Sequence, residues 1–236
     1  MATFRHVPTG KRFLFVHIPR TAGRFIETNL MVNNQFVWDD DWDKFGIDKV
    51  YRKVDGIELG HFHRELYEKH LDIEGIPHIS IVRNPFNRFI SASIYLKRVY
   101  GDDIQSVMED PMMFFSLIEN YPCTESINWY RPMVDFMSPK TQVWKFEDGF
   151  EEEFTTWLGG ILGVDLKFDP NIEYNKQVDE HNKLKLTPEL IHNLRDLYRK
   201  DIEQFYPELA TPFEEGTEAD LKTTGIASSK AKVTKY

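Results

Sequence analysis

The sequence has almost no cysteine, no long apolar run and no excess of positive charge. Cys123 is the one cysteine among 236 residues, so no disulfide forms within the chain and no cysteine-based metal site is possible. No apolar run approaches the roughly 18–20 residues that a membrane helix needs. The net charge of −9 disfavours a general nucleic-acid binder, although it is compatible with a local basic pocket. Neither a membrane nor a nucleic acid is therefore expected as a partner.

The first twelve residues, MATFRHVPTGKR, contain no apolar signal core, and a cytoplasmic protein is the default expectation. A hydrophobic content of 41% is typical of a globular chain rather than a disordered one. The length suffices for one sizeable core. We expect a single domain over residues 1–210. Apolar residues become sparse after it, which predicts a flexible or loosely docked tail over 211–236.

The chain is organised around residues 12–30, RFLFVHIPRTAGRFIETNL. Residues 13–18 form an apolar run of strand length, rich in aromatic and β-branched side chains. Pro19 ends the run, small residues follow, and 24–30 have the pattern of a helix start. Unpaired N–H groups and the helix dipole make such a helix start a good anion cradle, and Arg20 and Arg24 flank it. This predicts a phosphate or sulfate site, with an ordinary strand–helix connection as the alternative.

A second strand–turn–helix unit repeats this pattern. Residues 78–82 read as a buried strand that ends at Arg83, and Asn84-Pro85 then starts a helix over 86–94. A third strand is predicted at 141–146. Further helices are expected at 64–71, 108–119, 126–136, 150–162 and 187–206. Residues 1–11 read as a polar lead-in, and 33–53 as an irregular loop that its aromatic residues pin onto the core.

Strands that alternate with helices predict an α/β fold with a central, mostly parallel sheet flanked by helices. Ligands of such sheets bind beyond the carboxyl ends of the strands. This rule places Arg20, His61 and Arg83 on one rim, and it is the first inference that joins residues far apart in the sequence.

The turn after the first strand lacks both G-x-x-x-x-G-K-[ST] and G-x-G-x-x-G, which disfavours a nucleotide kinase or purine triphosphatase. Residues 15–25, FVHIPRTAGRF, instead resemble the phosphosulfate loop of sulfotransferases that use 3′-phosphoadenosine 5′-phosphosulfate (PAPS), which reads roughly F-x-H-x-P-K-T-x-G-T-S in the carbohydrate branch. Residues 82–95 resemble the family's 3′-phosphate motif, in which a Ser follows an Arg by eight positions, as Ser91 follows Arg83. Gly60-His61 resembles the Gly-His of uronyl 2-O-sulfotransferases. Residues 144–148 and 186–207 are similar to the family's closing motifs.

The resemblance implies a P-loop-like sulfotransferase fold and transfer of a sulfuryl group from PAPS to an acceptor hydroxyl, on a carbohydrate or a glycosylated small molecule, without a metal. The catalytic residues that it implies are His61, as base, and Arg20, as a cation at the leaving group. The implied donor-binding residues are Arg20, Thr21, Ala22, Gly23, Arg24, Phe25, Arg83 and Ser91. Arg suits the 3′-phosphate because its guanidinium is a permanent, forked cation.

The attacking hydroxyl must lose a proton, a task for which a neutral imidazole is suited. His61 is the predicted base, with His63 and Glu58 as rivals. His17 is expected to support the loop rather than to react. The remaining candidates sit in polar or helical surroundings and are read as surface residues: His6, His70, His181 and His192.

The chain departs from the family pattern at two places. The usual loop Lys is Arg20, which can stabilise charge but cannot donate a proton. The usual Thr-Ser after the glycine is Arg24-Phe25. These departures motivate an alternative, a relative that binds PAP or PAPS with impaired catalysis. Acceptor contacts are expected in the loops at 33–53 and 100–131, and the acidic balance favours a neutral hydroxyl over a heparan-like polyanion.

Overall fold

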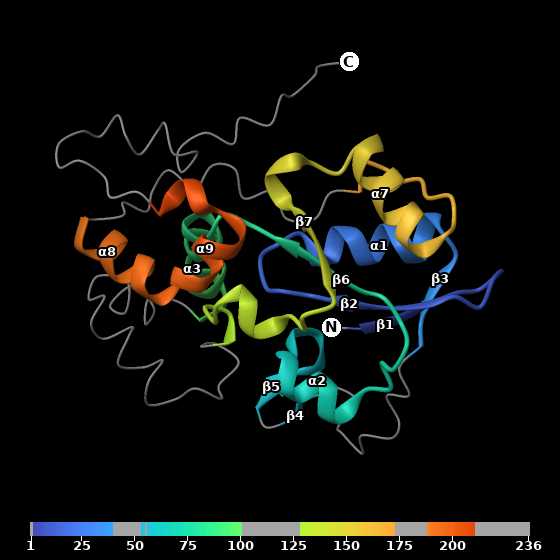
Figure 1. Ribbon diagram of the computed structural model, residues 1–236, viewed down its shortest axis with the longest axis horizontal. Helices are drawn as coiled ribbons and strands as arrows, with labels where there is room; N and C mark the ends of the chain where they lie inside the picture. Colours follow the sequence, from blue (N-terminus) through green and yellow to red (C-terminus); the bar gives the residue numbers. More distant parts are fainter. Residues whose placement is uncertain (1, 40–52, 55, 101–127, 173–187, 211–236) are drawn as a thin grey trace.

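The computed structural model describes residues 2–39, 53–54, 56–100, 128–172 and 188–210 (Figure 1). The predicted helix at 108–119, Trp42 and Phe45 of the predicted loop, and the tail at 211–236 lie outside these residues. Within them, no helix combines the length and the apolar character needed to cross a membrane.

Five strands form the main sheet, in the order β3-β1-β2-β6-β7. Strand β1 is antiparallel to both of its neighbours, while β2, β6 and β7 are parallel to one another. All strands except β1 therefore run in one direction, and the expected α/β architecture with a mostly parallel sheet is confirmed. The strands are β1 (Ala2–His6), β2 (Arg12–Val16), β3 (Phe36–Trp38), β6 (His78–Val82) and β7 (Thr141–Lys145), with a separate pair β4 (Lys53–Val54) and β5 (Ile57–Glu58).

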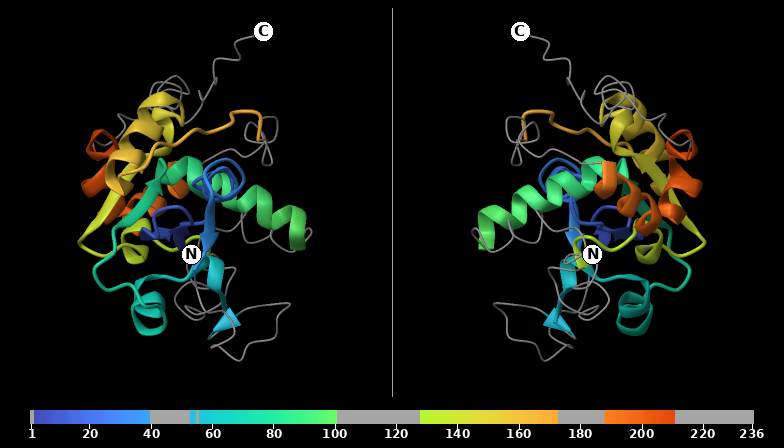
Figure 2. Two further views of the ribbon diagram at one scale, coloured as in Figure 1. Left: turned by 90° about the vertical axis from the view of Figure 1, so that its right-hand side faces the viewer. Right: turned by 90° about the vertical axis from the view of Figure 1, so that its left-hand side faces the viewer.

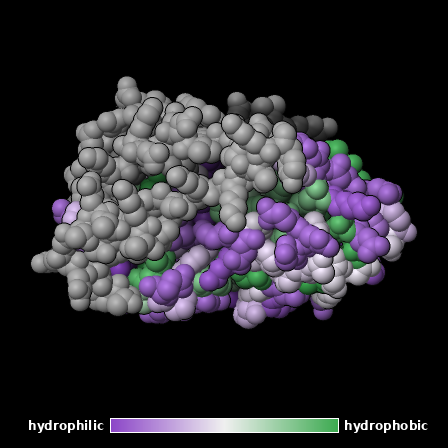
Figure 3. Space-filling model, turned by 90° about the horizontal axis from the view of Figure 1, so that it is seen from above, coloured by the Kyte–Doolittle hydropathy of each residue, from purple (hydrophilic) through white to green (hydrophobic). Residues whose placement is uncertain are grey.

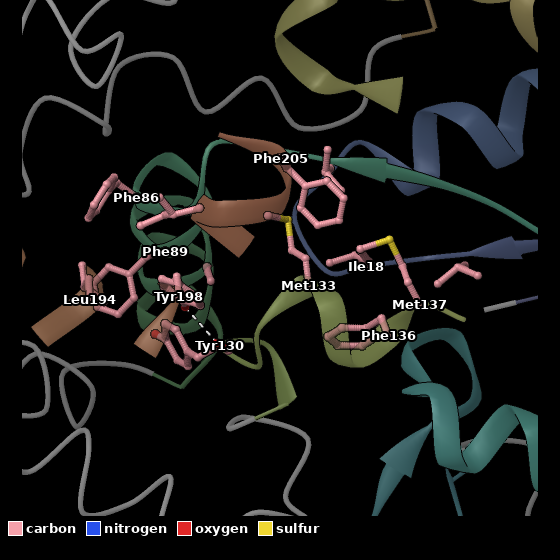
Figure 4. Packing of buried hydrophobic residues seen from close by; sticks show 14 of the residues in the cluster. Ile18, Phe86, Phe89, Tyr130, Met133, Phe136, Met137, Leu194, Tyr198 and Phe205 are labelled. Atoms are coloured by element: carbon pink, nitrogen blue, oxygen red, sulfur yellow. Dashed lines mark hydrogen bonds between the residues drawn. The ribbon is translucent and has the colours of Figure 1, made fainter. Parts of the chain in front are cut away.

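Helices cover both faces of this sheet, which is why its central strands are buried on both sides. Along β2, Phe13 and Phe15 pack with α1 and α7, whereas Leu14 and Val16 face the core that α3, α8 and α9 share. Figure 4 shows part of this second core. The helices are α1 (Gly23–Asn33), α2 (Arg64–His70), α3 (Pro85–Tyr100), α7 (Glu152–Leu162), α8 (Pro188–Leu197) and α9 (Arg199–Phe205), with 3₁₀ turns η2 (Leu59–His61), η3 (Met133–Phe136), η4 (Phe146–Asp148) and η6 (Pro207–Leu209).

The N-terminal segment is part of the sheet, so the prediction of a polar lead-in is wrong. Phe4 of β1 is fully buried and stacks on Phe13 of β2, with ring centroids 5.5 Å apart. The sequence signal is weak because polar and charged residues surround this single large side chain. Residues 36–38, expected to lie in an irregular loop, form the edge strand β3, in which Phe36 is buried and Trp38 is 46% exposed.

Most predicted helices are confirmed, and two need correction. Residues 126–136 do not form one helix in their described part, 128–136, because Pro132 interrupts it and only the short turn η3 follows. The helix expected from 187 to 206 is two helices, α8 and α9, which meet at Tyr198. Tyr198 is fully buried, and its hydroxyl donates a hydrogen bond of 2.8 Å to the Tyr130 carbonyl (Figure 4).

The parallel strands end where α1 and α3 begin, so the two strand–helix units lie side by side. Figure 2 shows α3 running outward from the sheet beyond this edge. From above, the described surface carries mostly hydrophilic side chains, with smaller apolar areas between them (Figure 3). The fold thus brings the turns after β2, β6 and β7 to one rim.

We predict that Phe4→Ala lowers the free energy of unfolding by about 3 kcal/mol, because it leaves a cavity between β1 and β2. Urea denaturation of the full chain measures this. Val7→Ala is the matched control: Val7 is 52% exposed just after the same strand, and its truncation should cost less than about 0.5 kcal/mol. Equal, small losses in both variants would mean that β1 is not a stabilising part of the sheet.

Candidate functional site

Two arginines that follow neighbouring parallel strands meet at the rim of the sheet. Arg20 comes after β2 and Arg83 directly after β6. The Arg83 guanidinium donates through Nη1 to the carbonyl oxygen of Arg20 at 3.1 Å. The rim predicted from the order of strands and helices therefore brings together residues 63 positions apart in the chain.

The turn before α1 is held in an unusual backbone conformation. Arg20 and Ala22 have φ values of 68° and 67°, in the left-handed region that residues other than glycine rarely adopt. The Thr21 hydroxyl is buried and donates to the Ile18 carbonyl at 2.9 Å, which braces the turn. Ala22, the N-cap of α1, provides no side-chain cap, and the first turn of the helix has no acidic residue. The start of α1 thus suits an anion.

Arg83 is a half-buried cation, and one of its donors is unsatisfied. Its guanidinium carbon lies 4.4 Å from the centroid of the Phe146 ring, and its Nε is buried with no hydrogen-bond partner in the described part of the chain. Burial, the largest cause, and the charge of nearby Arg20 together lower the pKa of Arg83 to about 10, although Glu147 acts in the opposite direction. The side chain stays protonated near neutral pH. An unpaired buried donor beside a second cation favours an anionic ligand.

Ser91 joins the two units. It is 1% exposed, and its Oγ accepts a 2.9 Å hydrogen bond from Nε of Arg20. The Arg20 guanidinium carbon also lies 5.0 Å from the centroid of the Tyr95 ring, one turn further along α3. The predicted loop residue and the predicted 3′-phosphate residue are therefore direct neighbours.

The start of α3 differs from that of α1, since its own residues cap it. Oδ1 of Asn84 accepts hydrogen bonds from the backbone N–H groups of Phe86 and Asn87 at 3.1 and 3.2 Å. The Asn84 N–H donates to Oε1 of Glu147 at 2.8 Å, and the Tyr206 hydroxyl donates to Oε2 at 2.8 Å. An anion at this second unit would therefore depend on Arg83 and Ser91 more than on helix N–H groups.

Glu147 and Tyr206 were not among the predicted site residues, yet they contact the start of α3 at this rim. Glu147 stands just after the third parallel strand, and Tyr206 near the end of the C-terminal helices, so both lie in segments that resemble the family's closing motifs. A carboxylate that follows a predicted strand, at the same rim as two arginines, is the signal that could have identified Glu147.

His17 supports the turn, as expected. Its Nδ1 lies 2.9 Å from Oε1 of Glu27, and the residue as a whole is 8% exposed. A methyl group at Gly23 would lie within 2.5 Å of this ring, so the glycine permits the close approach of the imidazole to α1. Burial acts to raise the pKa of Glu27, but the adjacent His17 outweighs it and the pKa is lowered.

His61 reaches the same rim from outside the main sheet. It belongs to the turn η2, after the separate pair β4–β5, and not to a strand of the main sheet. Its ring meets the rings of His17 and Trp129 edge to face, with centroids 5.3 and 5.2 Å apart. Nδ1 of His61 is 3.9 Å from Oε2 of Glu58. The predicted base thus lies against His17, whose ring packs closely on Gly23 at the start of α1.

Of the rival bases, Glu58 lies beside His61, while His63 lies in other surroundings. His63 is the N-cap of α2, and its Nε2 is 3.9 Å from Oε2 of Glu65. Burial, followed by the charge of Arg131, lowers the pKa of His63. Nδ1 of His63 is buried and has no hydrogen-bond partner among the described residues. The His61 ring contacts the His17 ring, whereas the described neighbours of His63 are Glu65 and Arg131, so His61 stays the predicted base.

The side chains of Arg24 and Phe25, which depart from the family pattern, lie in different surroundings. Arg24 is exposed in the first turn of α1. Phe25 packs its ring against Phe150 and Phe168, with centroids 5.5 and 5.9 Å apart. Phe25 thus supports the core between α1 and α7, and its side chain cannot replace a hydroxyl donor. Among the described residues, no group of histidine and acidic side chains could hold a metal ion.

One comparison with known proteins gives a match. Residues 6–110 match the model of a family described as the Sulfotransferase family, a stretch just under half of the chain that contains every predicted site residue. No curated protein and no solved structure matches the chain significantly. The match supports a sulfotransferase family and, with the sheet described above, a sulfotransferase α/β fold. The uronyl 2-O branch stays a prediction.

We predict that Gly23→Ala lowers the free energy of unfolding by about 1–3 kcal/mol, because the new methyl group collides with the His17 ring. The double variant with His17→Ala should cost clearly less than the sum of the two single changes, since it removes the collision. Chemical denaturation of the four proteins measures the coupling.

Gly160→Ala serves as the control within a helix. A methyl group at Gly160 of α7 would meet no atom of the described residues within 4 Å. This change should leave stability equal or raise it by roughly 0.5–1 kcal/mol. If Gly23→Ala behaved as Gly160→Ala does, the close packing of His17 on α1 would be wrong.

Proposed function

Taking the match of residues 6–110 to the sulfotransferase family as the premise, we propose that this protein transfers a sulfuryl group from PAPS to an acceptor hydroxyl of a carbohydrate or a glycosylated small molecule. The observation that carries the proposal is the pairing of two anion sites at one rim. One is the start of α1, which no side chain caps, and the other is the half-buried Arg83, whose Nε is buried without a described partner.

These two sites suit the two ends of one donor. The 5′-phosphosulfate fits the backbone N–H groups of residues 21–25 together with Arg20. The 3′-phosphate, which distinguishes PAPS from ATP, fits Arg83 and Ser91. The contact of 3.1 Å between Arg83 and the Arg20 carbonyl, and that of 2.9 Å between Arg20 and Ser91, support a common site rather than two unrelated ones.

In the proposed reaction, the acceptor oxygen forms a bond to sulfur as the bond from sulfur to the bridging oxygen of the 5′-phosphate breaks. His61 takes the acceptor proton, and PAP leaves with the negative charge. Arg20 stabilises this charge at the bridging oxygen, and it stays protonated throughout because a guanidinium has a very high pKa. Positioning and charge stabilisation thus account for most of the proposed rate acceleration, as in phosphoryl transfer.

In this proposal, His17 and Glu27 position the ring of His61. The carboxylate of Glu27 fixes the His17 ring, and the His17 ring contacts the His61 ring edge to face. An imidazole that two aromatic neighbours hold in place needs little reorganisation before it accepts a proton.

A second candidate is a relative that binds PAP or PAPS with impaired catalysis. The placement of Phe25 favours it, because this side chain packs on Phe150 and Phe168 where the family pattern has a hydroxyl. Turnover of labelled PAPS with a panel of hydroxyl acceptors separates the two candidates. PAP binding without any transfer would support the second.

We predict that PAP raises the melting temperature of the protein more than ADP does, and that Arg83→Gln removes most of this difference. The loss of a charge-assisted contact should lower PAP affinity about 10- to 100-fold. Isothermal calorimetry with both nucleotides measures this. Arg64→Gln is the control, because the Arg64 side chain is 43% exposed and pairs with Glu68 on α2. Equal protection by ADP and PAP in the wild type would contradict a 3′-phosphate site.

We also predict that His61→Ala lowers the transfer rate by about 10²- to 10⁴-fold and leaves PAP affinity within about twofold, because the base acts on the acceptor rather than on the donor. Initial rates with labelled PAPS measure the effect. His192→Ala is the control, since its side chain is 77% exposed on α8. Retained transfer in His61→Ala would assign the base to Glu58 or His63.

A further inference from the structure

A fully buried asparagine, in the turn formed by residues 128–134, bonds to the backbone of the predicted base. Nδ2 of Asn128 donates to the His61 carbonyl at 2.8 Å, and its Oδ1 accepts from Nε of Arg131 at 3.1 Å. Both halves of the side-chain amide are used, which fixes its orientation. The ring of the next residue, Trp129, meets the His61 ring with centroids 5.2 Å apart. The turn thus contacts His61 both at its backbone and at its ring.

Arg88 holds the carbonyl groups of this turn. It is fully buried in α3, and its guanidinium donates to three successive carbonyls, those of Trp129 at 3.1 Å, Tyr130 at 3.5 Å and Arg131 at 2.5 Å. The Tyr198 hydroxyl also donates to the Tyr130 carbonyl (Figure 4). Because a guanidinium presents its donors in a rigid fork, the carbonyls bound to it cannot shift independently of one another.

Asp201 holds the N–H groups that follow in the same turn. This aspartate of α9 is fully buried, and its two oxygens accept from the backbone N–H groups of Met133 at 2.8 Å and Val134 at 2.9 Å. Burial raises the pKa of Asp201 to about 6, while the charge of Arg88 and these two bonds act in the opposite direction. Near neutral pH, a cation of α3 therefore holds the turn by its carbonyl groups and an anion of α9 holds it by its N–H groups.

The segment that carries His61 lies outside the main sheet, so such an anchor matters for its position. The turn η2 follows the separate pair β4–β5, in which each strand comprises only two residues. An isolated two-stranded pair is at best marginally stable by itself. The bond from Asn128 connects this segment to a turn that two buried charges fix.

We infer that Asn128 is a positioning residue for His61, and that the buried Arg88 and Asp201 act on the base through the turn that carries Asn128. The inference rests on the proposed function, in which His61 takes the acceptor proton. In this role, Asn128 acts on the backbone of His61 and not on the donor or the acceptor. Since a displacement of about 1 Å can cost roughly 10²-fold in rate, loss of the anchor should affect the chemical step.

The first test is Asn128→Ala, which removes the donor and keeps the base. With labelled PAPS, kcat should fall about 10- to 100-fold, whereas KM for PAPS and the affinity for PAP should stay within about twofold. Asn128→Asp keeps the size of the side chain and its acceptor for Arg131, but an ionised carboxylate cannot donate to the His61 carbonyl. This variant should show the same loss, and it decides the question if Asn128→Ala does not fold.

Asn34→Ala is the matched control, because Asn34 is a buried asparagine with the same kind of bonds at the other end of α1. Its Nδ2 donates to the backbone carbonyls of Asn29 and Lys167 at 2.8 and 2.9 Å. The change should lower the melting temperature as Asn128→Ala does and leave kcat unchanged. An equal fall of kcat in both variants, or none in either variant of Asn128, would overturn the inference.

A double variant distinguishes an effect through His61 from a general one. The base is absent in His61→Ala, so adding Asn128→Ala should lower the residual transfer by less than about twofold. A further loss of about 10- to 100-fold would mean that Asn128 acts on another part of the site, which would overturn the inference.

An NMR measurement reports the same contact without turnover. The ring signals of His61 are assigned by their absence in His61→Ala. In the nucleotide-free protein, Asn128→Ala should shift or broaden these signals, and Asn34→Ala should leave them in place. If the wild type transfers no sulfuryl group, the proposed function fails, while the ring signals still decide whether Asn128 positions His61. If His61→Ala loses transfer but Asn128→Ala changes neither kcat nor the ring signals, the base stands and this inference fails.

Discussion

The hydrogen bond from Arg83 to the carbonyl of Arg20 connects the two strand–helix units on which the candidate site depends. It forms because β2 and β6 are parallel neighbours, so the residues that follow them leave the sheet at the same edge. Burial makes the Arg83 guanidinium costly to keep charged, and only part of that cost is offset by Glu147. A site that keeps a half-buried, partly unpaired cation has lost stability that a bound anion can restore.

The aromatic contacts explain how the rim keeps its shape around these charges. Phe146 lies against Arg83, Tyr95 against Arg20, and Trp129 against both Tyr95 and His61. Flat rings exclude water from one side of a guanidinium while leaving its edge N–H groups able to donate. The same arrangement keeps the base and the cations at fixed separations, because each ring contacts residues from two different elements.

Much of the fold and part of the site could be predicted from the sequence, since local patterns determine them. The apolar runs at 13–18 and 78–82 have strand character, and the small residues and proline after them mark the turns. Strand β1 could not be predicted, because only Phe4 marks its buried face. The contact of Trp129 with His61 was also beyond sequence reasoning, since it depends on how Arg88 holds a distant turn. Glu147 was similarly hidden, because its partners Asn84 and Tyr206 come from different elements.

The hydrogen bond between Tyr206 and Glu147 affects when the candidate anion site is completed during folding. Glu147 accepts from Asn84 at the start of α3 with one oxygen and from Tyr206, beside η6, with the other. The C-terminal helices and the anion-binding rim thus share one carboxylate. During synthesis, the strands β2 and β6 leave the ribosome long before Tyr206 does, so the rim is completed only when the last described segment folds back onto it. A growing chain can therefore form its sheet early and acquire its full anion site late.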